Sequence, residues 1–175
     1  GKGFGPAGGA TPRVRYGPGD APSAQWYDAT QCAVVSDARI RCAMAAGVGE
    51  GHRVIVEGIE GQSSPLSPAG QTLSYAPPVV REHHGAASDG ADTAGGQSIT
   101  LDGANFGPRD ADALPIVVAT GAYGQEVTAS GCAVAADSPH TRVVCTSTGA
   151  GTVGASVKWT VEVGGQRSTA STTSM

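Results

Sequence analysis

A short hairpin framed by two cysteines occurs twice and constrains the fold more than any other feature of the sequence. The first copy runs from Cys32 to Cys42, and the second runs from Cys132 to Cys145. Turn-forming residues stand at the centre of each copy, Ser36-Asp37-Ala38 in the first and Asp137-Ser138-Pro139-His140 in the second. The spacing therefore predicts two tight antiparallel hairpins whose cysteines face one another.

Alternation along the strands puts each cysteine pair on the same face as an aliphatic pair. The opposed residues are Cys32 with Cys42, Val34 with Ile40, Cys132 with Cys145, and Val134 with Val143. Four cysteines allow three pairings, and the duplication favours the local one, Cys32–Cys42 and Cys132–Cys145. Four buried free thiols are the alternative. A zinc site fits less well, because neither hairpin has C-x-x-C spacing or a clustered histidine pair.

The composition is typical of an all-β protein with small cores. The 175 residues include 27 Gly and 11 Pro, but only two Phe and two Trp. No stretch keeps the apolar spacing of an amphipathic helix, so we expect almost no helix. Each core should therefore be built mainly from aliphatic side chains.

Charge, apolar content and cysteine usage limit the classes of partner. The net charge of −4 argues against a nucleic-acid partner, because such surfaces are basic. No apolar run reaches the length of a membrane span, so we expect no membrane insertion in this segment. Paired cysteines indicate an oxidising compartment, which predicts a secreted, extracellular or cell-surface protein. The chain opens on Gly1 without a signal peptide, and we interpret it as an excerpt of a longer protein.

Further short motifs recur in the same order about a hundred residues apart. The recurring pairs are Phe4-Gly5-Pro6 with Phe106-Gly107-Pro108, Cys32-Ala33-Val34 with Cys132-Ala133-Val134, Gly47-Val48-Gly49 with Gly149-Ala150-Gly151, Val56-Glu57 with Val161-Glu162, and Gly61-Gln62 with Gly165-Gln166. This order predicts two homologous units, each the size of a small β-sandwich.

The boundary between the units is predicted at Tyr75-Ala76-Pro77-Pro78, which gives domains of residues 1–76 and 77–175. The alternating stretch Gln71–Tyr75 predicts a strand that closes the first unit. The two prolines restrict the backbone and should stiffen the joint between the units.

The second unit is expected to open with Val79–Arg81, followed by a polar, Gly-rich, mobile loop from Glu82 to Gly96. The alternation of Gln97–Gly103 predicts a strand that ends at the bend Asn105–Pro108. The first unit begins at its own version of that bend, Gly3–Pro6, so we expect it to lack its opening strand.

One longer strand is predicted further along each unit, at Gly51–Glu57 in the first and at Ala155–Val163 in the second. Alternate residues of the second of these strands share one apolar face, namely Val157, Trp159, Val161 and Val163. We therefore expect Trp159 in the core of its unit.

Taken in order, these motifs resemble the IPT/TIG family of immunoglobulin-like domains. The residues that carry the resemblance are Gly3-Phe4-Gly5 and Gly103-Ala104-Asn105-Phe106-Gly107, Ile40-Arg41-Cys42 and Val143-Val144-Cys145, Gly47-Val48-Gly49 and Gly149-Ala150-Gly151, and the joint Tyr75-Ala76-Pro77-Pro78. The match covers nearly all of both units, although the second unit has no such joint at its end.

The resemblance implies two tandem immunoglobulin-like β-sandwiches of the IPT/TIG type. Members of this family occur in cell-surface receptors, fibrocystin-like ectodomains, bacterial surface proteins and some transcription factors. The last group binds DNA through basic loops, and the net acidity and paired cysteines disfavour that branch here. The family has no catalytic site to transfer, so the resemblance implies a protein that is not an enzyme and uses no cofactor.

Two acidic or histidine-containing stretches are candidate metal sites. His83-His84 with Asp89 and Asp92 offers suitable ligand types, but the Gly-rich loop is not preorganised for a metal. Asp110-Ala111-Asp112 lacks the remaining ligands of a calcium loop. We therefore expect solvated polar loops at both places and no metal site.

Two further stretches are candidates for catalysis and for binding. Ser138-Pro139-His140 lies at a turn tip without a third orienting group, so a hydrolase is not expected. Trp26-Tyr27 is a candidate contact patch, although packing within the fold is favoured because aromatic rings carry large apolar areas.

Glycan attachment is the remaining candidate modification. The sequence has no N-x-S/T sequon, which excludes N-glycosylation. Ser/Thr-rich stretches with proline leave Ser64, Ser67, Thr169 and Thr172 as candidate O-glycosylation sites, with an ordinary hydrophilic loop and strand as the equal alternative.

These features predict a non-enzymatic structural segment of a multidomain secreted or cell-surface protein. Its tandem units would serve as spacers and lateral assembly surfaces in a fibre, a matrix or a ciliary-surface filament. Its partners would be other domains of the same chain and neighbouring protein subunits. The alternative is a receptor or adhesion ectodomain that binds a protein or glycan ligand through a patch such as Trp26-Tyr27.

Overall fold

The structure is a computed structural model that describes residues 1–19, 26–59, 61–88, 92, 94–109, 113–146 and 156–172. The chain divides into two compact units, Gly1–Ser74 and Tyr75–Met175. Strands, turns and bends make up the described part of the chain, which contains no helix. The prediction of an all-β fold is therefore confirmed, and the arrangement of antiparallel sheets is consistent with immunoglobulin-like β-sandwiches.

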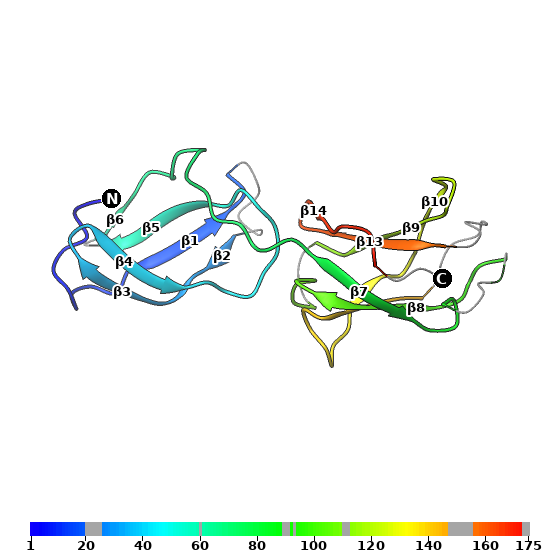
Figure 1. The fold of residues 1–175 in the computed structure, drawn as a ribbon. Helices are drawn as coiled ribbons and strands as arrows, with labels where there is room; N and C mark the ends of the chain where they lie inside the picture. Colours follow the sequence, from blue (N-terminus) through cyan, green and yellow to red (C-terminus); the bar gives the residue numbers. More distant parts are fainter. Residues whose placement is uncertain are drawn as a thin grey trace. The chain divides into compact units, whose positions relative to one another are not determined.

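The first unit consists of a four-stranded sheet and a separate two-stranded hairpin (Figure 1). The sheet has the order β2-β1-β5-β6, formed by Tyr27–Asp28, Arg13–Gly17, Arg53–Ile59 and Gln62–Ser63. The hairpin consists of β3, Thr30–Ser36, and β4, Arg39–Ala43.

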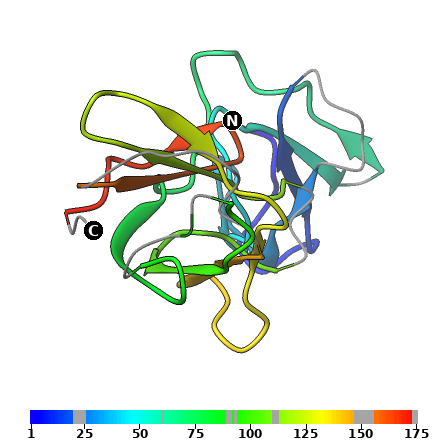
Figure 2. The same cartoon turned by 90° about the vertical axis from the view of Figure 1, so that its right-hand side faces the viewer.

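The second unit contains two four-stranded antiparallel sheets, one above the other in Figure 2. The first has the order β10-β9-β13-β14, formed by Glu126–Thr128, Ile116–Thr120, Lys158–Val163 and Gln166–Arg167. The second has the order β11-β12-β8-β7, formed by Ala133–Val134, Arg142–Cys145, Ile99–Ala104 and Val79–His84.

Both cysteine-framed hairpins form with the predicted register. Val34 pairs with Ile40 across β3 and β4, and Val134 pairs with Val143 across β11 and β12. Disulfides join Cys32 to Cys42 and Cys132 to Cys145, and the chain has no free cysteine. Each hairpin is therefore closed covalently at its open end.

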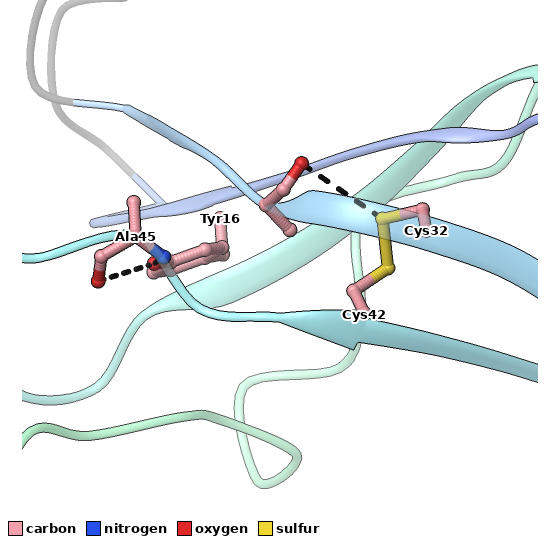
Figure 3. The surroundings of a disulfide bond; sticks show 5 residues. Tyr16, Cys32, Cys42 and Ala45 are labelled. Carbon is pink, nitrogen blue, oxygen red and sulfur yellow. Dashed lines mark hydrogen bonds between the residues drawn. A yellow bond between two sulfur atoms is a disulfide. The ribbon is translucent and has the colours of Figure 1, made fainter.

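Figure 3 shows the first disulfide, between β3 and β4, together with Tyr16 of β1 and Ala45. The Cys32 sulfur is 3.8 Å from the carbonyl oxygen of Ala29. Nearby, the Tyr16 hydroxyl accepts a hydrogen bond of 2.9 Å from the Ala45 N–H and lies 3.4 Å from the Ala45 carbonyl oxygen. The segment that follows β4 is thus fastened to β1.

The second unit has a continuous core between its two sheets. Alternation places Ile99 and Leu101 of β8 and Trp159 of β13 inside, and all three side chains are buried. The expected position of Trp159 is confirmed. The cluster also contains Val80, Ala87, Phe106, Val117, Ala119, Ala129, Val134, Val143, Cys145, Val157 and Val161. The first unit has fewer buried side chains, because its hairpin sheet has only two strands.

The Phe-Gly-Pro bends anchor the chain to the turn of each hairpin in the same way. The Phe4 N–H donates to the Asp37 carbonyl oxygen at 2.9 Å, and the Phe106 N–H donates to the His140 carbonyl oxygen at 3.0 Å. Gly103 lets Phe106 approach, because a Cβ at that position would lie 1.9 Å from the Val79 carbonyl oxygen and 2.6 Å from the Phe106 ring.

The structure differs from the predicted strands at two places. The stretch Gln71–Tyr75 is not a strand, because only Leu73 pairs, in a single bridge with His52. The polar residues Glu82 to His84 belong to β7 rather than to a loop. A bulge between Val80 and Glu82 shifts the register there, so the alternation that would reveal the strand is interrupted.

Candidate functional site

An apolar groove lies in the first unit. It has a volume of about 470 Å³ and lies between the four-stranded sheet and the β3–β4 hairpin. Its walls include Val14 of β1, Ile40 and Cys42 of β4, and Val54 and Val56 of β5. Phe4, Tyr16, Met44 and Leu73 also line it. Met44 and Leu73 are 45% and 37% exposed, so apolar surface is open to solvent here.

The same position in the second unit is filled. Pairing of β1 with β5 and of β9 with β13 makes Val117 the counterpart of Val14, and Val161 the counterpart of Val56. The cysteines of the two hairpins make Val143 the counterpart of Ile40. Val117, Val143 and Val161 are fully buried, whereas Ile40 and Val56 are only partly buried.

Two strands account for this difference in burial. In the second unit, β8 pairs with β12, and β7 pairs with β8. Ile99, Leu101 and Val80 on these strands enter the core. In the first unit, β4 is the counterpart of β12, and among the described residues its other edge pairs with no strand. The groove is therefore the place that β7 and β8 occupy in the second unit.

A charged pair marks the end of the β8–β12 contact in the second unit. The Arg142 guanidinium donates to both carboxylate oxygens of Asp102, at 2.7 and 3.2 Å, and the His84 ring nitrogen lies 3.6 Å from the same carboxylate. The hydrogen bond from Arg142 holds the pKa of Asp102 below its ordinary value, with a smaller contribution from His84. The counterpart of Arg142 in the first unit is Arg39, three residues before Cys42.

A second group of charges crosses the sheet of the first unit. The Arg13 guanidinium donates to Asp28 at 2.9 and 3.2 Å, and this hydrogen bond lowers the pKa of the Asp28 carboxyl. Arg15 lies 3.7 Å from Glu57 and 3.9 Å from Asp28. These cross-strand pairs on β1, β2 and β5 are solvent-exposed or half-exposed, so each contributes little to stability.

The structure separates the two members of the candidate contact patch. Tyr27 stacks on Tyr16 with ring centroids 5.4 Å apart, and its hydroxyl accepts a hydrogen bond of 3.2 Å from the Val48 N–H. His52 packs edge-on against both tyrosine rings. Trp26 instead lies half-buried under the Arg15 guanidinium, which is 5.6 Å from the centroid of its ring. The two side chains of the candidate patch therefore have different neighbours, although both are partly buried.

The two histidines considered as metal ligands point to opposite faces of β7. His84 faces Asp102, whereas His83 is partly buried opposite Leu101, and its ring nitrogens have no hydrogen-bond partner within the described residues. The structure therefore does not bring them together as a ligand pair. Asp92 is exposed and hydrogen-bonds locally through its backbone N–H to Gln97.

The remaining acidic residues of the metal hypotheses, Asp89, Asp110 and Asp112, lie outside the described residues. Within the described ranges, no group of three or more histidine, cysteine or acidic side chains could hold a metal ion.

At the β11–β12 turn, the Ser138 carbonyl oxygen accepts backbone hydrogen bonds from Thr141 and Arg142, and the His140 N–H donates to the Gly107 carbonyl oxygen. The turn thus anchors the bend at Gly107.

The serines considered for glycosylation take part in a strand-edge contact that the sequence analysis missed. The Ser64 and Ser67 hydroxyls accept hydrogen bonds of 3.0 Å from the Val56 and Val54 N–H groups of β5. Both hydroxyls also donate, to the carbonyl oxygens of Pro65 and Gln71. A glycan on either serine would take the place of the hydroxyl hydrogen, so the donated hydrogen bond of that serine would be lost.

The second unit repeats this contact. The Ser168 and Ser171 hydroxyls accept hydrogen bonds from the Val161 and Trp159 N–H groups, at 3.0 and 3.1 Å. The signal in the sequence is the repeated pattern Gly-Gln-x-Ser-x-x-Ser, at 61–67 and 165–171. Thr169 and Thr172, between and after these serines, are exposed.

No family model, curated protein or solved structure matches this chain. The resemblance to IPT/TIG domains therefore stays a prediction from the motifs. Across the described residues, no helix is long and apolar enough to cross a membrane. The two disulfides indicate an oxidising environment of the extracellular type.

Proposed function

We propose that the chain is a non-enzymatic structural segment of a multidomain secreted or cell-surface protein. Its two immunoglobulin-like units, of the IPT/TIG type, act as spacers and lateral assembly surfaces in a fibre, a matrix or a ciliary-surface filament. Their partners are other domains of the same chain and neighbouring protein subunits.

The observation that carries this proposal is a contact between a bend and a disulfide-closed hairpin, which both units repeat. In each unit a Phe-Gly-Pro bend hydrogen-bonds to the turn of a hairpin whose far end is closed by a disulfide. In the chain-entropy model, closing loops of this length stabilises the folded state by about 3 kcal/mol each. Covalent reinforcement of small aliphatic units suits a protein that must keep its shape outside the cell.

Imaging of the native assembly tests the proposal. An antibody against the 175-residue chain should label the surface of intact, non-permeabilised cells or the matrix around them. Electron microscopy of the labelled material should show the units in regular contact with neighbouring subunits. Labelling found only inside cells would contradict the proposal. So would images that show only free monomers at high protein concentration.

A ligand-binding ectodomain is the second candidate, and the position of Trp26 favours it. The Trp26 ring lies half-buried beneath the Arg15 guanidinium, which is itself 3.9 Å from the Asp28 carboxylate. An aromatic ring beside charged groups is a common feature of protein contact sites. Under this hypothesis, Trp26→Ala should abolish capture of a protein or glycan ligand while leaving the melting curve unchanged. Loss of the fold in that variant would count against a binding role.

A further inference from the structure

The second unit shows what the groove of the first unit is shaped to hold. There, β8 runs antiparallel to β12, with Ile99 opposite Cys145, Leu101 opposite Val143 and Asp102 opposite Arg142. Ile99 and Leu101 fill the space between the sheets and are fully buried. The Asp102 carboxylate meets Arg142 at the end of the pairing.

The first unit presents the same three positions without that strand. Cys42, Ile40 and Arg39 on β4 are the counterparts of Cys145, Val143 and Arg142. Ile40 and Cys42 line the open groove. Arg39 is exposed, and no carboxylate pairs with it among the residues that the structure describes.

We propose that the groove binds an extended peptide strand from outside these 175 residues, which adds antiparallel to the free edge of β4. The strand has aliphatic residues at two alternate positions and an acidic residue directly after the second one, as in Ile99-Thr100-Leu101-Asp102. Its aliphatic side chains cover Val14, Val54 and Val56, and its carboxylate pairs with Arg39.

Two physical arguments select this occupant. An unpaired strand edge offers backbone N–H and C=O groups that another strand can satisfy, while alternate side chains enter the apolar space beside it. The charge of Arg39 adds a preference for an acidic residue at one position, because like or missing charges there lose the ion pair. A folded second copy cannot supply the segment directly, since its own β8 is paired on both sides, with β7 and β12.

This inference deepens the proposed function, because strand addition is one way in which such a unit joins its neighbours in an assembly. The test uses the full 175-residue protein and, as probe, a peptide with the sequence of Gln97–Ala104. Hydrogen exchange of the β4 amides and isotope-edited NMR are measured with and without the peptide. The peptide is expected to slow exchange at β4 and to shift the resonances of Ile40, Val54 and Val56.

Register and charge provide matched controls. A peptide with the Leu101→Asp change should not bind, because it places a charge in the apolar groove. The surface variant Arg39→Glu should bind the original peptide about tenfold more weakly, because two like charges then meet. A peptide with the Asp102→Arg change should restore binding to that variant, which a purely structural effect of Arg39→Glu could not do.

Three results would overturn the inference. The first is unchanged β4 exchange at saturating peptide. The second is equal binding of the Leu101→Asp peptide. The third is β4 protection that grows with protein concentration in the absence of peptide, which would make a second copy the occupant. None of them would change where the native protein is found or how its units lie in the native assembly, so the proposed function would be judged separately.

Discussion

The Arg142 guanidinium donates two hydrogen bonds, of 2.7 and 3.2 Å, to the Asp102 carboxylate across β12 and β8. This pair joins the disulfide-closed hairpin to the strand that fills the core of the second unit. The pair lies next to the buried Leu101, at the last residue pair of the β8–β12 register.

The stability of the second unit should depend on pH through Asp102. The pKa of this carboxyl is lowered in the folded state, mainly by the hydrogen bond from Arg142. Its contribution is therefore present above the unfolded-state pKa of about 4 and is lost as the pH falls through the lower, folded-state value. Asp102→Asn should be less stable than the wild type at neutral pH, and the two stability curves should converge in acid. Parallel curves from neutral to acidic pH would contradict this role.

Gly103 should tolerate no side chain. A Cβ there would lie 1.9 Å from the Val79 carbonyl oxygen, which belongs to a paired strand and cannot move away. Gly103→Ala should cost about 3 kcal/mol or more in urea unfolding, followed by the fluorescence of buried Trp159. Gly124→Ala is the control, because a Cβ at Gly124 would have no atom within 4 Å apart from its chain neighbours. Only the positive φ of Gly124 then costs energy, about 1 kcal/mol. Equal effects of both changes would refute the packing argument.

The Ser171 hydroxyl should stabilise the edge of β13. It is buried and accepts the hydrogen bond of the Trp159 N–H, which would otherwise lose its partner. Ser171→Ala should therefore lower the free energy of unfolding by about 1–3 kcal/mol. Thr169→Ala, at a neighbouring exposed position, should change it by less than about 0.5 kcal/mol. Calorimetry in which the two variants melted alike would show that the serine contact is dispensable.

Tyr27 should act as a structural residue of the first unit. Its hydroxyl accepts a hydrogen bond from the Val48 N–H and its ring stacks on Tyr16. Tyr27→Phe should lower the free energy of unfolding by about 1 kcal/mol. Tyr123→Phe provides the control, since Tyr123 is 91% exposed and should show no change. A Tyr27→Phe variant as stable as the wild type would show that the hydroxyl contact of Tyr27 is dispensable for the fold.

The hairpins could be predicted from sequence because cysteine and aliphatic spacing within each copy decides the register locally. The extent of β7 could not, because a bulge after Val80 interrupts the alternation and polar side chains occupy the rest of the strand. No stretch of the sequence has the apolar spacing of an amphipathic helix, and the motifs recur in the same order. These two features were enough to indicate two similar all-β units.

The candidate site was only partly accessible to sequence reasoning. The motif order predicted that the first unit lacks its opening strand, and in the described part of that unit no strand takes the place of β8 beside the groove. The cysteine spacing alone matches Arg39 to Arg142, but the partner of Arg142, Asp102, is set by tertiary pairing and could not be predicted. The roles of Ser64 and Ser168 likewise depend on which N–H groups lie opposite them.

Disulfide mapping of the purified, non-reduced protein tests the central claim most directly, namely that each unit is closed by its own hairpin bridge. Proteolysis followed by mass spectrometry should give one linked peptide pair containing Cys32 and Cys42, and another containing Cys132 and Cys145. Free thiols, or a bridge from a cysteine of one unit to a cysteine of the other, would contradict the account.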